Sequence, residues 1–280
     1  MQPFLKWPGG KRWFVSQYKS LIVAAGINQY YEPFLGSGAV FFSVLPSQAI
    51  LSDINEELVN VYKVMKDNPI ALRRVLEEHQ KKHNREYYYR IRETIPKDSI
   101  CQAGRTLYLN RTCFNGMYRV NRAGNFNVPI GTKTNCTFDC DQFENYSKAL
   151  KGAEILSADF ESIVIKANKN DFIFIDPPYA MNKETGFVKY NQIYFTWDDQ
   201  LRLFHSVCQA RDRGAKVLMT NASSKELISL YQTEGFKIVI HERKSTISGK
   251  ADSRKMIQEA IIASFSIPAG GDISEDSFYK

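Results

Sequence analysis

Residues 171–179 read Asp-Phe-Ile-Phe-Ile-Asp-Pro-Pro-Tyr, and this stretch decides the fold. The apolar run at 172–175 predicts a strand buried on both faces, as in a parallel sheet covered by helices. The two prolines that follow cannot continue a strand ladder, so the chain must leave the sheet in a stiff loop. Open α/β sheets bind ligands outside the carboxyl ends of their strands. The stretch therefore predicts a site that gathers the Asp176 carboxylate, a fixed carbonyl and the Tyr179 ring, with a tight turn as the alternative.

Composition limits the class of protein. The chain has 280 residues, of which 44% are apolar, enough for one large domain with an insertion or two smaller ones. A net charge of +7 favours a polyanionic partner. We expect no membrane association, because the N-terminus lacks an apolar signal segment and no run approaches the length of a membrane span. The scattered cysteines predict free thiols in a reducing cytoplasm.

Two residue pairs resemble fragments of metal sites. Cys136 and Cys140 lack a second pair at the spacing of zinc ligands. His79 and His83 are four residues apart in a helical sequence rich in Gln and Lys, a pattern typical of a solvated helix face. We therefore predict that the protein binds no metal.

The N-terminal segment at residues 4–12 reads Phe-Leu-Lys-Trp-Pro-Gly-Gly-Lys-Arg and precedes a helical pattern from Trp13 to Ala25. A glycine loop with Lys11 at a helix start can hold an anionic group, and Trp7 offers a flat apolar surface. The segment is not a P-loop, since the first glycine and the Ser/Thr after lysine are missing. An ordinary helix entrance is the alternative interpretation.

A strand, a glycine loop and a helix follow at residues 30–42. Gly36 and Gly38 give part of the dinucleotide-binding pattern and let a ligand approach the backbone closely. A second strand at 49–54 contains Asp53, an acid placed where ribose hydroxyls are commonly bound. A cofactor with a nucleoside is predicted, and NAD would also suit the spacing; the alternative role of Asp53 is a helix N-cap.

Residues 55–150 predict a helical insertion between strands of the main sheet. Four helices are expected, at Glu56–Lys66, Pro69–Lys82, Glu86–Ile95 and Gln102–Thr112. Residues 101–135 contain no Asp or Glu but five basic residues, Arg105, Arg111, Arg119, Arg122 and Lys133. Asn and aromatic residues lie among them, the types that read base edges and stack on bases. A hairpin is expected at 118–128 around Gly124, and a solvated basic loop is the alternative to a nucleic-acid surface.

The main sheet then resumes with a strand at Ala153–Leu156, followed by Asp159 and Phe160. The remaining pattern predicts helices and strands in alternation, at Trp197–Arg213, Lys216–Thr220, Lys225–Thr233, Lys237–His241 and Glu259–Phe265. A frayed tail is expected at 268–280. We predict an α/β protein with one domain formed by residues 1–54 and 151–270 and a second, inserted domain at 55–150.

Together these stretches resemble the Dam-type DNA adenine-N6 methyltransferases over residues 4–266. The motifs that carry the resemblance follow the family's order: Lys6-Trp7-Pro8-Gly9-Gly10-Lys11, Phe34-Leu35-Gly36-Ser37-Gly38, Ser52-Asp53-Ile54-Asn55, Asn115-Gly116-Met117-Tyr118-Arg119, Phe126-Asn127-Val128-Pro129 and Asp176-Pro177-Pro178-Tyr179. The resemblance implies a Rossmann-like methyltransferase sheet with an inserted, mainly helical recognition domain that carries a β-hairpin.

The resemblance also implies a set of site residues. S-adenosylmethionine is the implied cofactor, and the matching positions are Trp7, Lys11, Gly36, Gly38, Asp53, Asp159 and Asp176. In the family's arrangement the target amino group donates to the carboxylate at Asp176 and the carbonyl at Pro177, while Tyr179 stacks on the flipped base. The positions that match DNA contacts are Lys6, Asn115, Met117, Arg119 and Pro129.

The implied substrate is double-stranded DNA. Members that methylate GATC often read Gly-Arg-Tyr-Lys where this chain has Gly131-Thr132-Lys133, so one arginine contact is missing. Methylation of RNA adenine, cytosine N4 or a protein glutamine is an alternative, as is a catalytically silent nucleic-acid-binding protein. The intact Asp176, Gly36 and Asp53 argue for the enzyme. We expect a monomer of bacterial or phage type, with or without a companion restriction endonuclease.

Overall fold

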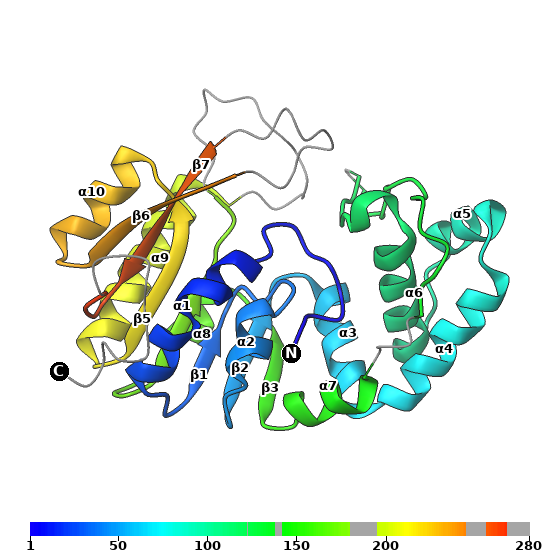
Figure 1. Cartoon of the computed structure of the whole chain (residues 1–280), viewed down its shortest axis with the longest axis horizontal. Coiled ribbons are helices and arrows are strands. Elements are labelled where there is room, and N and C mark those ends of the chain that lie inside the picture. Colours follow the sequence, from blue (N-terminus) through cyan, green and yellow to red (C-terminus); the bar gives the residue numbers. More distant parts are fainter. Residues whose placement is uncertain (122, 138–141, 180–194, 245–255, 268–280) are drawn as a thin grey trace.

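The computed structural model describes residues 1–121, 123–137, 142–179, 195–244 and 256–267. Its centre is a sheet of seven strands in the order β3-β2-β1-β4-β5-β7-β6 (Figure 1). The strands are β1 (Tyr30–Glu32), β2 (Ala49–Asp53), β3 (Ala153–Ser157), β4 (Phe172–Ile175), β5 (Lys216–Ala222), β6 (Lys237–Lys244) and β7 (Met256–Ala263). The first five are parallel, and β7 runs antiparallel between β5 and β6. This is the Rossmann-like sheet that the sequence predicted.

The central strand β4 shows how the sheet is held between two layers. Successive side chains of a strand point to opposite faces. Phe172 and Phe174 accordingly enter one hydrophobic core, while Ile173 and Ile175 enter the other. The first core contains α1 (Arg12–Ala25), α2 (Ala39–Val44) and α3 (Glu56–Asp67). The second contains α8 (Phe160–Val164), α9 (Trp197–Asp212) and α10 (Lys225–Thr233). The buried strand predicted from the apolar run is confirmed.

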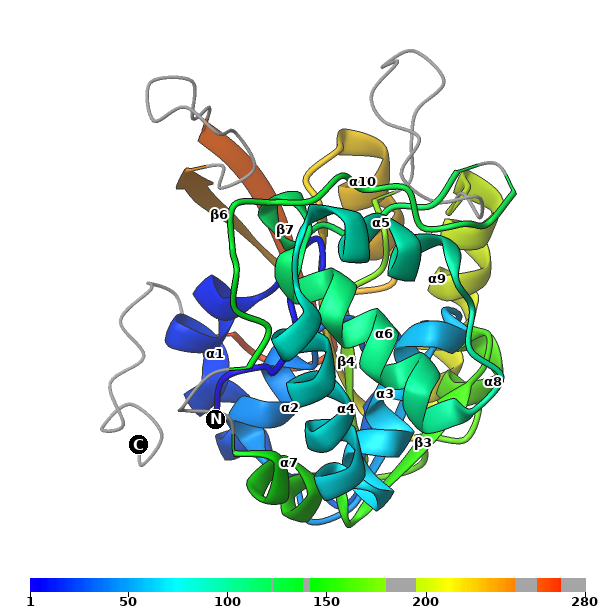
Figure 2. The same cartoon turned by 90° about the vertical axis from the view of Figure 1, so that its right-hand side faces the viewer.

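The helical insertion lies between β2 and β3 in the chain. It begins with α3 and continues through α4 (Pro69–Lys82), α5 (Arg85–Glu93), α6 (Ser99–Thr112), the short 3-10 helix η1 (Phe114–Gly116) and α7 (Phe143–Leu150). Figure 1 shows α4, α5 and α6 as a lobe beside the sheet, and Figure 2 views the molecule from that side. All residues from Ala103 to Thr112 are buried, so α6 is the core of the lobe.

The predicted hairpin forms with a single antiparallel bridge between Val120 and Phe126. The Asn121 N–H donates to the Asn125 carbonyl at 2.8 Å, and Gly124 supplies a positive φ of 80° at the turn. Arg122 lies outside the described residues. The turn places the residues before and after it side by side, at the edge of the insertion.

His79 of α4 does not lie on a solvated face, so that interpretation is wrong for this residue, whereas His83, the C-cap of α4, is half exposed. His79 is buried, with its Nδ1 2.8 Å from the Tyr87 hydroxyl and its ring stacked on Tyr108. The Nδ1 of His83 lies 2.9 Å from the Tyr108 hydroxyl. Burial lowers the pKa of His79 to about 4, so its neutral ring serves the core. Cys140 lies outside the described residues.

In the described part of the chain, no helix is both long and apolar enough to cross a membrane. The same residues contain no group of three or more His, Cys, Asp or Glu side chains that could hold a metal ion. The expected tail at 268–280 lies outside what the structure describes.

Candidate active site

The site is built around Asp176, the first residue after β4 at the carboxyl edge of the sheet. Its carboxylate lies 3.0 Å from the Lys11 Nζ and accepts a hydrogen bond of 2.8 Å from the Thr220 hydroxyl on β5. Burial raises the pKa of Asp176, and the Lys11 ammonium opposes that effect. Pro177 is buried, whereas Tyr179 is 39% exposed. The site therefore combines a carboxylate that is fixed by two partners, Asp176, with a partly exposed aromatic ring, Tyr179.

Lys11 is a buried cation that contacts oxygen atoms of three described residues. Besides Asp176, its ammonium contacts the Gly9 carbonyl at 3.2 Å and a carboxylate oxygen of Glu259 at 3.4 Å. It also lies 5.7 Å from the centre of the Tyr179 ring. The sequence analysis assigned Lys11 to the cofactor and gave no role to Thr220 or Glu259. The sequence signal for Glu259 is an acid directly before the apolar run at residues 260–263.

The glycine loop after β1 is closed by Asp53 at the tip of β2. The backbone N–H groups of Gly36 and Asn55 both donate to the Asp53 carboxylate, each at 3.0 Å. Asn55, whose side chain accepts the Leu58 N–H, is the N-cap of α3. The alternative role of Asp53 as that N-cap is therefore wrong. Burial raises the pKa of Asp53 and these N–H donors counteract it.

Gly36 and Gly38 both have positive φ values, of 48° and 65°. A Cβ at Gly38 would lie 2.9 Å from the Tyr62 hydroxyl, and one at Gly36 would lie 3.1 Å from the Trp7 ring. Trp7 therefore packs directly on the glycine loop. The close approach explains why side chains are absent at these two positions.

Asp159 lies at the carboxyl end of β3, where it caps α8 by accepting the Glu161 N–H. Its carboxylate also pairs with Arg202 at 2.8 Å. The preceding Ala158 N–H donates to the Asp53 carbonyl at 3.3 Å, so this turn adjoins the tip of β2. Trp7, Lys11, Asp53, Asp159 and Asp176 thus share one edge of the sheet, although Asp159 is engaged with Arg202.

The predicted DNA-contacting residues gather where the N-terminal segment meets the insertion. The Asn110 side chain bonds both the N–H and the carbonyl of Lys6, at 2.9 and 2.7 Å. A Cβ at Gly116 would lie 2.5 Å from the Lys6 side chain, which shows that Lys6 covers η1. Burial and the neighbouring Lys133 ammonium lower the pKa of Lys6. Two adjacent cations of this kind favour an anionic partner.

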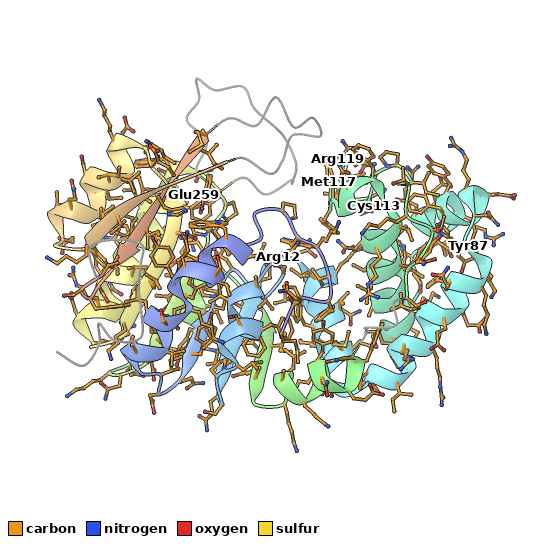
Figure 3. All side chains as sticks on the ribbon, viewed as in Figure 1. Arg12, Tyr87, Cys113, Met117, Arg119 and Glu259 are labelled. Carbon is orange, nitrogen blue, oxygen red and sulfur yellow. The ribbon has the colours of Figure 1, made fainter. Side chains whose placement is uncertain are left out.

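The other predicted contacts lie on η1 and the hairpin. Figure 3 shows Met117 and Arg119 together at the edge of the insertion. The Arg119 Nε donates to the Asn127 side chain at 2.7 Å, which fixes the guanidinium across the hairpin. Asn115 is exposed, with a positive φ of 56°, and Pro129 is exposed as well. Phe114, half exposed beside them, is one of the aromatic residues of the basic stretch, although the resemblance assigned it no DNA contact.

Two of the five basic residues counted in this region are structural, contrary to the interpretation of a wholly basic surface. Arg105 is 4% exposed and donates to the carbonyls of Ile91 and Arg92. Arg111 is 8% exposed and donates to the carbonyls of Phe4 and Cys136. These guanidinium groups satisfy backbone acceptors inside the insertion, so they cannot meet a ligand.

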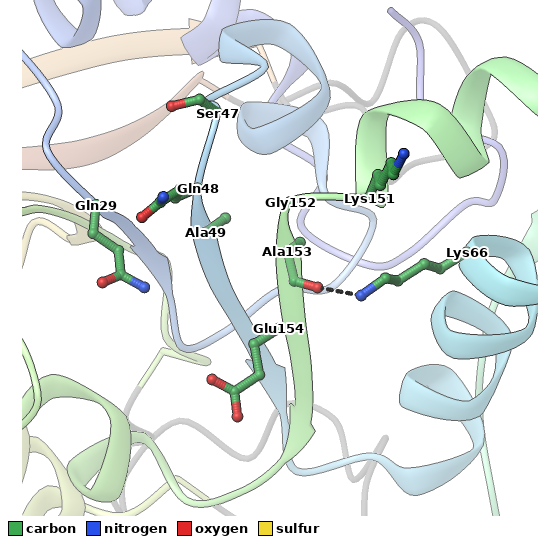
Figure 4. A pocket seen from close by; sticks show the side chains of 9 residues that line it. All are labelled: Gln29, Ser47, Gln48, Ala49, Lys66, Lys151, Gly152, Ala153 and Glu154. Atoms are coloured by element: carbon green, nitrogen blue, oxygen red, sulfur yellow. Dashed lines mark hydrogen bonds between the residues drawn. The ribbon is translucent and has the colours of Figure 1, made fainter.

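A separate hollow of about 520 Å³ lies at the opposite edge of the sheet (Figure 4). It is lined near the amino ends of β2 and β3 by residues that include Gln48, Lys66 and Glu154. The Lys66 ammonium donates to the Ala153 carbonyl there. Ligands of open α/β sheets bind at the carboxyl ends of the strands, so this hollow is not the candidate site.

The geometry around Asp176 supports a particular chemistry. A carboxylate followed by a rigid proline carbonyl can accept two hydrogen bonds from one amino group. The Tyr179 ring can stack on a planar heterocycle that carries this amino group. The neighbouring glycine loop and Asp53 suit a second ligand with a nucleoside. The site can therefore bring a nucleotide-like donor and an aromatic amine together.

The comparisons with known proteins agree with this chemistry. The sequence profile of the family described as "D12 class N6 adenine-specific DNA methyltransferase" matches residues 7–247. A Type II methyltransferase, M1.LlaDCHI of Lactococcus lactis subsp. cremoris, is 38% identical over 275 residues, which cover 95% of this chain and 96% of the relative. The Type II methyltransferase M.MjaIII of Methanocaldococcus jannaschii is 36% identical, with coverages of 91% and 96%. A DNA adenine methylase of Vibrio cholerae is 31% identical, with coverages of 92% and 94%.

Proposed function

This chain belongs to the family of D12 class N6 adenine-specific DNA methyltransferases, and from that premise we propose which of its residues carry the reaction. The enzyme transfers a methyl group to N6 of adenine in DNA, and S-adenosyl-L-methionine is its methyl donor. We assign catalysis to Asp176, the Pro177 carbonyl and Tyr179. The observation that carries this assignment is the Asp176 carboxylate, which is held by Lys11 and Thr220 immediately before two prolines.

The adenine amino group needs help before it can accept a methyl group. Its lone pair is delocalised into the ring, and in duplex DNA the base must first be flipped out at a cost of a few kcal/mol. Hydrogen bonds donated by the amino group to Asp176 and Pro177 pull the nitrogen toward tetrahedral geometry and free the lone pair. Because the prolines fix the carbonyl in advance, the acceptors need no reorganisation during the reaction. Tyr179 is assigned to stacking on the flipped base.

The residues at the carboxyl ends of β1 and β2 fit S-adenosylmethionine. The Asp53 carboxylate accepts backbone N–H groups of Gly36, Asn55 and Ile54, and a carboxylate has about four lone-pair sites, so acceptor capacity remains. It is proposed to bind the ribose hydroxyls, while Gly36 and Gly38 allow close approach and Trp7 supplies an apolar wall. Lys11, Asp159 and Asp176 complete the proposed cofactor site. When bound, the cofactor supplies an electrophilic methyl group on a sulfonium.

Double-stranded DNA is the proposed form of the substrate, bound by Lys6, Asn115, Met117, Arg119 and Pro129. The adjacent ammonium groups of Lys6 and Lys133 support a phosphate or base contact at this edge. GATC is the target sequence that we propose to test first. We also propose that residues 55–150 act as the recognition domain of a monomer working in the cytoplasm, and that 1–54 with 151–270 form the catalytic domain. A companion restriction endonuclease is compatible with the Type II relatives.

Substitution of Asp176 tests the catalytic assignment. Purified Asp176→Ala protein should lose methyl transfer from tritiated S-adenosylmethionine to duplex DNA, while its thermal unfolding stays cooperative. Asp198→Ala, which removes an exposed acid at the start of α9, is the matched control and should stay active. An Asp176→Ala activity within about tenfold of wild type would contradict the assignment. Running duplex DNA and RNA side by side separates DNA methylation from the RNA alternative.

A further inference from the structure

The Lys11 ammonium is held in three directions by groups that come from different parts of the chain. Its partners are the Gly9 carbonyl in its own loop, the Asp176 carboxylate after β4 and the Glu259 carboxylate on β7. The Gly9 carbonyl accepts a hydrogen bond of 3.2 Å, and the two carboxylates form ion pairs of 3.0 and 3.4 Å with the ammonium. Lys11 is only 4% exposed, and its flexible side chain therefore depends on these partners for its position.

Glu259 is unusual for its place in the fold. It lies on β7, opposite Ala222 of β5 and His241 of β6, and it is 1% exposed. Figure 3 shows it on β7, in the half of the sheet that lies away from the insertion. A buried carboxylate is costly unless a charge or hydrogen bonds compensate it. Its contact with Lys11 links this buried charge to the proposed catalytic carboxylate.

We propose that Glu259 is a positioning residue for methyl transfer, whose carboxylate holds the Lys11 ammonium beside Asp176 and shares that ammonium with it. The inference rests on the proposed catalytic role of Asp176. With Lys11 and Asp176 alone, the pair would be neutral and the Asp176 oxygens weaker acceptors. With Glu259, the Lys11 ammonium is drawn toward a second carboxylate, so Asp176 keeps its attraction for the amino hydrogens.

The negative charge that Asp176 keeps has a use in the reaction. As the bond from N6 to the methyl carbon forms, the bond from that carbon to sulfur breaks and its electron pair stays on sulfur. The amino nitrogen becomes positive at that moment, until one of its protons is released to solvent. Preorganised charge aimed at the developing charge is an effective form of catalysis.

In the described part of the chain, four groups from other elements interact with Asp176. They are Lys11 from the start of α1, Thr220 from β5, Glu259 from β7 and Glu32 from β1. Burial has the largest effect on the pKa of Asp176 and raises it, Lys11 and Thr220 lower it, and Glu259 raises it. Loss of the Glu259 charge should therefore lower the pKa of Asp176 and move the acid limb of the pH–rate profile to lower pH.

The test compares Glu259→Gln with wild type and with Glu242→Gln. Glu242 lies on the neighbouring strand β6, is exposed and bonds Gln258, so its substitution is a matched control. Single-turnover rates on duplex DNA should fall about tenfold in Glu259→Gln, a loss of about 1.4 kcal/mol in transition-state stabilisation. The affinities for S-adenosylhomocysteine and for DNA should stay within about threefold of wild type, because the residue acts on the transfer step. The acid limb should move to lower pH, which a merely structural role would not cause.

A double-mutant cycle shows whether Glu259 acts through Lys11. In a Lys11→Met background, Glu259→Gln should cause no further loss of rate, because the partner is already absent. If Glu259→Gln alone does not fold, the double variant is compared with Lys11→Met, and equal single-turnover rates support the proposal. The proposal is overturned if Glu259→Gln lowers the rate by the same factor in the wild-type and the Lys11→Met backgrounds. It is also overturned if the Glu259→Gln enzyme has the rate and the acid limb of wild type. If instead Asp176→Ala is active, the proposed function fails independently of Glu259.

Discussion

The indole of Trp7 stacks on the ring of Tyr118, with 4.6 Å between the ring centroids and 27° between their planes. Trp7 also packs on Gly36 in the proposed cofactor loop. Tyr118 lies between Met117 and Arg119 and donates a hydrogen bond of 3.1 Å to Glu57. One aromatic contact therefore joins the glycine loop to the residues proposed to read DNA.

Loss of this stack should weaken cofactor binding even though Tyr118 is outside the proposed cofactor site. Aromatic pairs contribute about 0.5–1.5 kcal/mol beyond the area that they bury, so Tyr118→Leu should weaken S-adenosylhomocysteine binding by about two- to tenfold. Tyr118→Phe keeps the stack and loses only the hydroxyl, with its bonds to Glu57 and Asn55, so it should bind like wild type. Isothermal titration calorimetry without DNA measures both. Equal affinities in Tyr118→Leu and wild type would show that Trp7 holds its place without Tyr118.

Asp53 should matter for the cofactor and not for DNA alone. Hydrogen bonds to a charged group contribute about 1.5–3 kcal/mol, so Asp53→Ala should weaken S-adenosylhomocysteine binding by about ten- to a hundredfold. Part of this loss reflects the Gly36 N–H, which the Asp53 carboxylate also holds. DNA binding in the absence of cofactor should stay near wild type, as measured by fluorescence anisotropy.

Asp67→Ala is the control for that experiment, because Asp67 is an exposed acid at the end of α3. It should leave both affinities unchanged. Unchanged cofactor affinity in Asp53→Ala would remove the residue from the proposed ribose site and leave it a structural role in closing the glycine loop.

Much of the fold could be predicted because its signals are local. The apolar run before Asp176 identified β4, and the boundaries of α4 and α10 agree with the predicted Pro69–Lys82 and Lys225–Thr233. The helix α7 was missed, and β7 begins three residues earlier than the expected Glu259. The position of β7 between β5 and β6 depends on pairing between strands that are distant in sequence. The local pattern of apolar and polar residues does not reveal such pairing.

The site was only partly predictable for the same reason. Asp176 and Asp53 follow strands, so sheet topology alone places them at one edge. Thr220 and Glu259 become partners of Asp176 and Lys11 only through the order of β4, β5 and β7. From the sequence, Arg105 was counted as part of a basic surface, yet its guanidinium donates hydrogen bonds to the backbone carbonyls of Ile91 and Arg92. Sequence gives the charge of a side chain but not which backbone acceptors lie within its reach.

The buried Glu32 predicts a specific pH dependence of stability. Burial raises its pKa from 4.5 to about 8, although the Tyr30 hydroxyl and the Phe41 N–H donate to its carboxylate. Between these two values the folded protein keeps the proton and the unfolded chain loses it. The folded state then binds more protons, so the free energy of unfolding attributable to Glu32 should fall as pH rises, by up to about 1.4 kcal/mol per pH unit.

Glu32→Gln should remove this slope, because the amide stays neutral in both states. Urea unfolding at pH 5, 6, 7 and 8 measures the difference between variant and wild type, which should grow in favour of Glu32→Gln as pH rises. Glu226→Gln replaces an exposed acid on α10, and its free energy of unfolding should depend on pH as that of wild type does. A Glu32→Gln curve that is also parallel would mean that Glu32 is ionised in the folded protein.

Arg119 should read a base. Its guanidinium is fixed across the hairpin by the Asn127 side chain and carbonyl, at 2.7 and 3.3 Å. A guanidinium held in one orientation suits bidentate recognition of guanine O6 and N7. Arg119→Ala should therefore cost about 1–3 kcal/mol on the correct site and much less on DNA altered at that base pair. Specificity should relax as binding weakens.

A phosphate contact would behave differently, and salt separates the two roles. If Arg119 bound a phosphate, affinity would fall about equally for every sequence and the salt slope would shrink by about one unit. Titrations of wild type and Arg119→Ala against a cognate duplex and its single substitutions, at several salt concentrations, decide between them. Arg74→Ala, at an exposed arginine of α4, is the matched control for charge and should change neither specificity nor slope. An equal loss on all duplexes would make Arg119 a backbone anchor, and base reading would then fall to Lys6, Asn115 and Met117.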